Sequence, residues 1–159
     1  MEKEQLIDAV RDWFDENDLS YEFDAEREVI RSGFDISCKL RNLRFFVTFC
    51  ENGFTVVASA PVQGDPNDLG QLMRYLHQAN YGLRNGNFEL DVRDGEVRYK
   101  CWVSSNGLDS IPSDIIASSV FVPCSMMERY GDGIAALAMG FSDADTEIEK
   151  AEKPKESDD

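Results

Sequence analysis

The sequence predicts an α+β fold, in which a single twisted antiparallel β-sheet is accompanied by three helices in the order helix, strand meander, helix, hairpin, helix. Two observations carry this prediction. Three segments place apolar residues at helical spacing, and two others alternate apolar and polar residues around Asn-Gly or Asp-Gly. Antiparallel strands joined by tight turns, with helices inserted between them, are typical of α+β domains.

The first helix is indicated by an apolar stripe near the N-terminus, with acidic residues filling the other positions. Its members are Leu6, Ile7, Val10, Trp13 and Phe14. The pattern then becomes extended from Tyr21 to Ile36, with a bend expected at Ser32-Gly33.

A hairpin is predicted around Asn52-Gly53, the pair that favours a type I′ turn. A two-residue loop at this pair would place Phe49 opposite Val56 and Val47 opposite Ala58. This gives the hairpin one apolar side. The opposite side is mixed and comprises Phe46, Thr48, Thr55, Val57 and Ser59.

The second helix has an apolar stripe made of Leu69, Leu72, Met73, Leu76, Ala79 and Leu83. Asn80 lies close to this stripe, and we expect its side chain to bond backbone near the end of the helix. The less favoured alternative is that Asn80 lines a ligand pocket. His77 is the only histidine, and a histidine on a helix flank is far more often structural than catalytic.

The second hairpin spans Phe88 to Trp102 and is predicted to turn at Asp94-Gly95. In that register Phe88, Leu90 and Val92 face Cys101, Tyr99 and Val97, while Asp91 pairs with Arg98 and Glu89 pairs with Lys100 across the strands. The charged residues are thereby explained as structural pairs. Trp102 is left without a partner in the hairpin.

The third helix is predicted to begin at Ser110-Ile111-Pro112 and to continue to Tyr130. Pro123 is expected to kink or interrupt it, and Gly131 and Gly133 to break it again. The acidic segment that follows is expected to begin as frayed helix and then to be disordered. The sequence therefore predicts one domain over residues 1–141 and a disordered acidic tail over residues 142–159.

The formal net charge of −15 argues against nucleic acid and anionic membranes as partners, because both are bound through Lys and Arg. The chain shows neither a secretory signal nor an apolar run long enough to span a membrane, so we expect a cytoplasmic protein. Cys38, Cys50, Cys101 and Cys124 are interpreted as reduced thiols.

Motifs for catalysis, phosphate binding and metal binding are missing from the sequence. The clustered carboxylates lack the spacing of a calcium loop and are interpreted as solvated surface. We therefore expect no catalytic residues, no cofactor and no metal.

Three apolar residues are predicted to point away from the apolar rows of their strands: Phe46, Val57 and Trp102. Several such residues on one sheet face indicate that something covers the face. The cover could be the second helix, a second subunit or a partner peptide, and the sequence leaves these alternatives open.

Several short motifs resemble a known family: Ala79-Asn80, Gly86, Phe88-Glu89-Leu90-Asp91, Gly95-Glu96-Val97 and Ile111-Pro112. They resemble the class I chaperones of type III secretion and, more closely, the YbjN-type proteins, which are described as bacterial sensory transduction regulators and share that chaperone-like fold. The likeness to YbjN-type proteins continues through Tyr130, Gly133 and Gly140 to about Phe141. It implies one twisted antiparallel sheet with three helices.

Class I chaperones are small, acidic and usually dimeric, and they hold partly unfolded secreted proteins on apolar surface. Pro123 and the long acidic tail distinguish this sequence from them. From the residues and the resemblance together, we expect a non-enzymatic protein that binds another protein or a second copy of itself, as a homodimer. It would be chaperone-like or regulatory and use Phe46, Val57 and Trp102. The alternative is a small-molecule sensor or enzyme with a pocket near Asn80 and His77.

Overall fold

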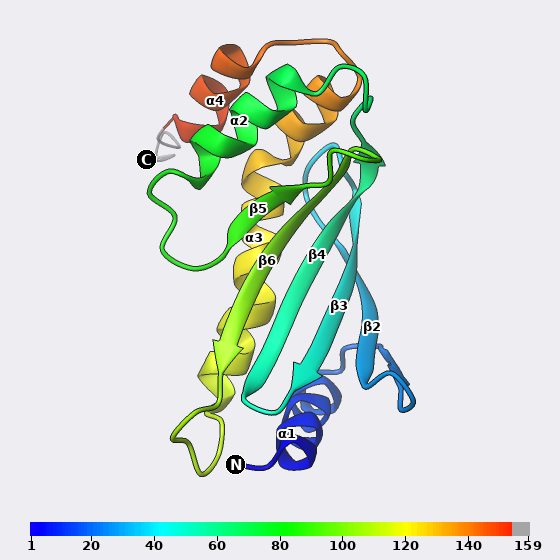
Figure 1. Ribbon diagram of the computed structural model, residues 1–159, viewed down its shortest axis with the longest axis vertical. Helices are drawn as coiled ribbons and strands as arrows, with labels where there is room; N and C mark the ends of the chain where they lie inside the picture. The colour runs from blue at the N-terminus through cyan, green and yellow to red at the C-terminus, as the bar shows by residue number, and fades with distance from the viewer. Residues whose placement is uncertain (154–159) are drawn as a thin grey trace.

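Six strands and four helices make up the protein, for which a computed structural model describes residues 1–153 (Figure 1). The helices are α1 (Lys3–Glu16), α2 (Gly70–Asn80), α3 (Ser113–Ala138) and α4 (Ala144–Glu152). The strands are β1 (Glu22–Asp24), β2 (Val29–Asp35), β3 (Asn42–Cys50), β4 (Gly53–Gln63), β5 (Asn87–Leu90) and β6 (Glu96–Ser104).

All six strands form one sheet in the order β1-β2-β3-β4-β6-β5, and every neighbouring pair is antiparallel. The predicted fold class is confirmed. α4 is an additional element, so the described chain has four helices where the sequence predicted three.

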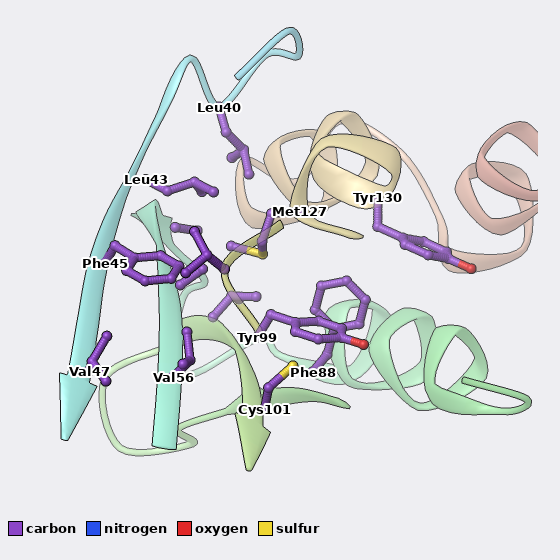
Figure 2. Packing of buried hydrophobic residues seen from close by; sticks show 14 of the residues in the cluster. Leu40, Leu43, Phe45, Val47, Val56, Phe88, Tyr99, Cys101, Met127 and Tyr130 are labelled. Carbon is purple, nitrogen blue, oxygen red and sulfur yellow. The ribbon is translucent and has the colours of Figure 1, made fainter. Parts of the chain in front are cut away.

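One face of the sheet carries the core, which we call the inner face. Its side chains meet α3 and α1, which lie behind the sheet in Figure 1. Figure 2 shows how side chains from β3, β4 and β6 point toward Met127 and Tyr130 of α3. The aromatic rings of Phe88, Tyr99 and Tyr130 contact each other edge to face, with centroids 4.9 and 5.4 Å apart.

Both predicted hairpin turns are displaced, although each side chain stays on its predicted face. In the first hairpin Phe49 pairs with Phe54, because the loop is Glu51-Asn52 and Gly53 already belongs to β4. A close approach explains this register. A Cβ on Gly53 would lie 2.1 Å from the Val103 carbonyl oxygen of β6, so only glycine fits at this paired position.

In the second hairpin Phe88 pairs with Tyr99, and Glu89 with Arg98. The predicted two-residue turn is wrong, since residues 91–95 form a longer loop. Asp91 accepts hydrogen bonds from the backbone and guanidinium of Arg93, and Gly95 takes a φ of +78° where its backbone meets Gly64. These side-chain and backbone contacts replace the expected pairing of Asp91 with Arg98.

Helix α3 continues without a break through Pro123, Gly131 and Gly133, contrary to the predicted interruptions. The two glycines allow neighbouring elements to approach. A Cβ on Gly131 would lie 2.6 Å from Cys38 Sγ, and one on Gly133 would lie 2.3 Å from Tyr75 Oη. Packing against α2 and the β2–β3 loop therefore outweighs the helix-breaking tendency of these residues.

Helix α4 occupies part of the segment expected to begin as frayed helix and then to be disordered, and the disorder predicted for residues 142–159 is wrong for residues 144–152. Asp143 caps the helix by accepting from Thr146 N–H. The helix packs against α2 and α3, with Ala144 and Glu147 buried. The expectation for residues 154–159 lies outside the described residues.

Candidate protein-binding surface of the sheet

The outer face of the sheet, opposite the core, brings together the three apolar residues singled out in the sequence. Phe46 pairs with Val57, and Val57 pairs with Lys100. In the adjacent cross-strand row Thr55 pairs with Trp102. Since side chains on paired residues lie on the same face, Phe46, Val57 and Trp102 occupy two adjacent rows of one surface.

These three residues differ in exposure. Phe46 and Val57 are half-buried, whereas 49% of Trp102 is exposed. The indole lies across Gly53, because a Cβ there would come within 2.9 Å of its Cζ2 and Cη2 atoms. Because Gly53 has no side chain, the indole can lie flat against the strand there, and the rest of the ring is exposed to solvent.

No helix covers this face among residues 1–153. In Figure 1 the outer face is turned toward the viewer, with α1 and α3 behind it and α2 near β5 and α4. The second helix, one of the three covers considered from the sequence, is therefore excluded. A second subunit or a segment of another protein remains as a possible cover of this face.

Charged side chains surround the apolar residues in paired form. Glu89 lies within 2.7 Å of Arg98 Nε and also contacts Lys100 Nζ. Burial alone would raise the pKa of Glu89, but hydrogen bonds from Lys100 and Arg98 outweigh it and hold this pKa below its ordinary value. The carboxylate is therefore ionised and paired with Arg98 and Lys100, and it is a poor proton donor near neutral pH.

Further pairs complete this surface. Arg31 contacts Asp24 at 3.1 Å. The buried hydroxyl of Ser59 donates to Glu96 at 2.6 Å. The basic side chains Arg31, Arg98 and Lys100 thus each have a carboxylate partner on this face. The pairs form a charged rim beside the apolar residues.

Sequence reasoning missed a groove at the side of Trp102. It has a volume of about 410 Å³ and lies between the end of β6 and the first turns of α3, where Asp114 and Ile115 line it. No local pattern indicated this groove, because its walls come from elements that the sequence does not place side by side.

Asn80 and His77, the two residues of the alternative site, do not line a common pocket. The Asn80 amide donates to the Phe88 carbonyl at 3.0 Å and accepts from Phe88 N–H at 2.7 Å. The predicted structural role of Asn80 is therefore confirmed. His77 lines a separate hollow of about 280 Å³ between α2 and α4, and Asn80 does not contribute to its lining.

The four cysteines are all free thiols, and burial raises the pKa of Cys101 and of Cys124 to about 11.

Within residues 1–153, no group of three or more His, Cys, Asp or Glu side chains is arranged to hold a metal ion. Over the same residues, none of the helices is both long and apolar enough to cross a membrane.

Comparisons with known proteins identify the family. The profile of the YbjN family, described as "Putative bacterial sensory transduction regulator", matches residues 6–111 and ends just before α3. The crystal structure of YbjN from E. coli, described as "a putative transcription regulator", is similar with a TM-score of 0.60 and 14% sequence identity, over 84% of this chain and 92% of that chain.

No curated protein matches the chain in sequence. The structural likeness supports the fold of the whole domain, and the family profile covers more than half of the chain. The resemblance to YbjN-type proteins is confirmed: the chain belongs to the YbjN family.

Proposed function

We propose that this protein is a non-enzymatic regulator of the bacterial cytoplasm that acts by binding another protein or a second copy of itself. The description of its family as sensory transduction regulators supports the regulatory part. The observation that carries the binding part is the uncovered outer face, where Trp102 is 49% exposed beside the half-buried Phe46 and Val57.

The chemistry of this face fits protein recognition better than catalysis. Aromatic residues with an apolar body are enriched at protein interfaces, and the charged rim can align a partner. Glu89 is paired with Arg98 and Lys100, and it lines a broad, open hollow of about 750 Å³ beside the second hairpin. Its paired carboxylate favours a role in aligning a partner over a role in proton transfer.

Capture of partners from the cytoplasm of the source bacterium tests the proposal. Immobilised wild-type protein is compared with Trp102→Ser and Phe46→Ser, and bound chains are identified by mass spectrometry. Phe141→Ser is the matched control, because Phe141 is 77% exposed but lies on the α3–α4 connection. We expect each face variant to reduce capture of the same protein at least tenfold and the control to retain it.

Two further measurements complete the test. Urea unfolding should show that Trp102→Ser costs no more than about 3 kcal/mol and leaves a cooperative transition, since only half of the side chain is removed from water. Sedimentation identifies a second copy as the partner if wild type dimerises and the face variants do not. Equal capture by all four proteins, or unfolding of Trp102→Ser, would contradict the proposal.

A small-molecule sensor predicts a different result. A ligand in the hollow beside His77 would raise the melting temperature in proportion to its occupancy. We expect a thermal-shift screen of metabolites and divalent metals to give no shift above 2 °C, roughly what 1 kcal/mol of linkage gives in a domain of this size.

A further inference from the structure

Strand β6 has an open edge over its last four residues. β5 pairs with β6 only as far as Lys100, which lies opposite Asn87. Residues 101–104 remain paired with β4 on their other side. Gly86 ends the β5 pairing: its φ is +78°, and its backbone packs against the Lys100 carbonyl and Cys101 Sγ. The chain at Asn85 therefore turns off the edge before it can pair with Trp102.

The backbone groups at this edge can be assigned from the alternation of an antiparallel ladder. Ser105 N–H donates to the Asn52 carbonyl, toward β4. Since successive residues direct their N–H and C=O groups to opposite sides, Val103 and Cys101 also point toward β4, and Trp102 and Ser104 point away. Asp91 N–H donates to the Glu96 carbonyl on the β5 side, which agrees with this parity.

The groove of about 410 Å³ runs along these unpaired groups. Trp102 borders it on the outer face, and Ile115 of α3, which is 38% exposed, borders it on the inner side. Asp114, in the first turn of α3, is the charged residue of the lining. The groove thus offers backbone hydrogen bonds along its floor, the Trp102 ring on its outer side, and Ile115 among polar residues of α3 on its inner side.

We propose that this groove binds an extended, basic segment of another protein as an added strand beside residues 101–104 of β6. The inference rests on the proposed protein-binding function and specifies its partner and binding mode. Main-chain bonds to Trp102 and Ser104 provide affinity, and alternate side chains of the segment meet Trp102 on one face and Ile115 on the other.

Charge distinguishes the two possible occupants of the groove, a segment of another protein and a second copy of this chain. The lining contributes Asp114, and the chain carries −15, so a segment with Lys or Arg is attracted. A second copy would bring two Asp114 side chains and two strongly acidic molecules to one short edge. The observations therefore favour a basic partner over self-pairing through β6.

Hydrogen exchange of single amides, followed by NMR in the full chain, provides the direct readout. In the free protein the Trp102 and Ser104 amides should exchange at least tenfold faster than those of Cys101 and Val103. The probe is the acetylated and amidated peptide Lys-Val-Thr-Val-Thr-Val-Lys. Saturation with it should slow exchange at both positions at least tenfold, whereas the same peptide with Glu at both ends should not.

Ser104→Pro is the decisive variant, because it removes only an outward N–H and leaves the pairing with β4 intact. Ser104→Ala is its matched control, since both lose the hydroxyl that accepts from Asn106 N–H. We expect the alanine variant to bind the Lys peptide like wild type and the proline variant to bind at least tenfold more weakly. Equal binding by both variants, or by both peptides, overturns the inference, as does dimerisation that protects the Trp102 amide.

Capture of the partner by these variants tests the protein-binding function separately from strand addition at β6. If Phe46→Ser loses the partner and Ser104→Pro retains it, the protein-binding function stands and strand addition is wrong. If Ser104→Pro also loses the partner and Ser104→Ala retains it, both are supported. If no variant changes capture, the proposed function fails, and protection of Trp102 by the Lys peptide still decides whether the edge accepts a strand.

Discussion

Asn80 connects the end of α2 to the start of β5 through both ends of its amide. Phe88 N–H donates to Asn80 Oδ1, and the Phe88 carbonyl accepts from Asn80 Nδ2, so a single side chain bonds this residue as a neighbouring strand would. This role was predictable from the sequence, because an Asn beside an apolar stripe must satisfy its amide when buried. The backbone it bonds to was not predictable, since Phe88 becomes its neighbour only in the fold.

We predict that Asn80→Ala lowers the free energy of unfolding by about 2 kcal/mol, because it leaves the Phe88 N–H without a partner and leaves the Phe88 carbonyl with only the bond from Asn87. Urea unfolding followed by circular dichroism measures this change. Gln78→Ala, on an exposed position of the same helix, is the control and should stay within about 0.5 kcal/mol of wild type. A loss in Asn80→Ala no larger than that in Gln78→Ala would show that the amide bonds to Phe88 contribute little to stability.

The prediction that Gly131 and Gly133 break the third helix is wrong, because it considers only the residue type. Glycine within a helix costs about 1 kcal/mol relative to alanine, so two of them predict a break. Here the missing Cβ atoms admit Cys38 and Tyr75. The Tyr75 hydroxyl also donates to the Tyr130 carbonyl at 2.9 Å. The sequence does not reveal these partners, because they come from the β2–β3 loop and α2.

At the scale of elements, the sequence predicted the two hairpins but not their registers. Each hairpin is shifted by two residues, so Phe49 meets Phe54 and Phe88 meets Tyr99. A shift of two preserves the face of every side chain, and the hydrophobic pattern therefore could not distinguish the two registers. Contacts of Gly53 with β6 and of Gly95 with Gly64 determine them instead.

The β2–β3 loop is attached to α3 by two carboxylates that lie one helical turn apart. Glu128 accepts from Ser37 N–H and Asp132 accepts from Lys39 N–H, each at 2.7 Å. Cys38 lies between them against Gly131. The loop thus closes over the helix at three consecutive residues, an arrangement that depends on the unbroken course of α3.

We predict that replacing both acceptors, in Glu128→Ala/Asp132→Ala, accelerates hydrogen exchange at Ser37 and Lys39 at least tenfold, as expected for the loss of about 1.5 kcal/mol per charged bond. Exchange within β3 should change little, because α3 gains helix-forming residues and keeps its packing. Ser125→Ala, on an exposed position of α3, is the control. Equal protection of Ser37 in variant and wild type would mean that packing of Cys38 holds the loop.

At the scale of the whole molecule, the helices lie on one side of the sheet and leave the other open (Figure 1). The sequence did not predict this asymmetry, because Phe46, Val57 and Trp102 indicated a covered face, with the second helix as one possible cover. It did not exclude α2 as a cover, since periodicity gives the faces of an element and not its position. The chain carries a net charge of −15, and opposite charges are paired on the outer face.

This charge distribution predicts a loss of stability in acid. The pKa of Glu89 is lowered in the folded state by Lys100 and Arg98 against the effect of burial, and that of Asp91 is lowered to about 2 by Arg93. A group with a depressed folded pKa stabilises the fold above its unfolded pKa, which is 4.5 for Glu and 3.8 for Asp. The contribution is lost as the pH falls through the folded value.

We predict that Glu89→Gln lowers the free energy of unfolding by about 1 kcal/mol at pH 7, because two partly buried ion pairs are lost. The difference from wild type should shrink as the pH falls below 4.5 and vanish once the pH is below the depressed folded pKa of Glu89. Urea unfolding at half-unit pH steps measures it. Glu149→Gln breaks an exposed ion pair with Lys153 and should change stability little at any pH. A Glu89→Gln deficit that does not shrink at any pH below 4.5 would show that shape, and not charge, makes Glu89 stabilising.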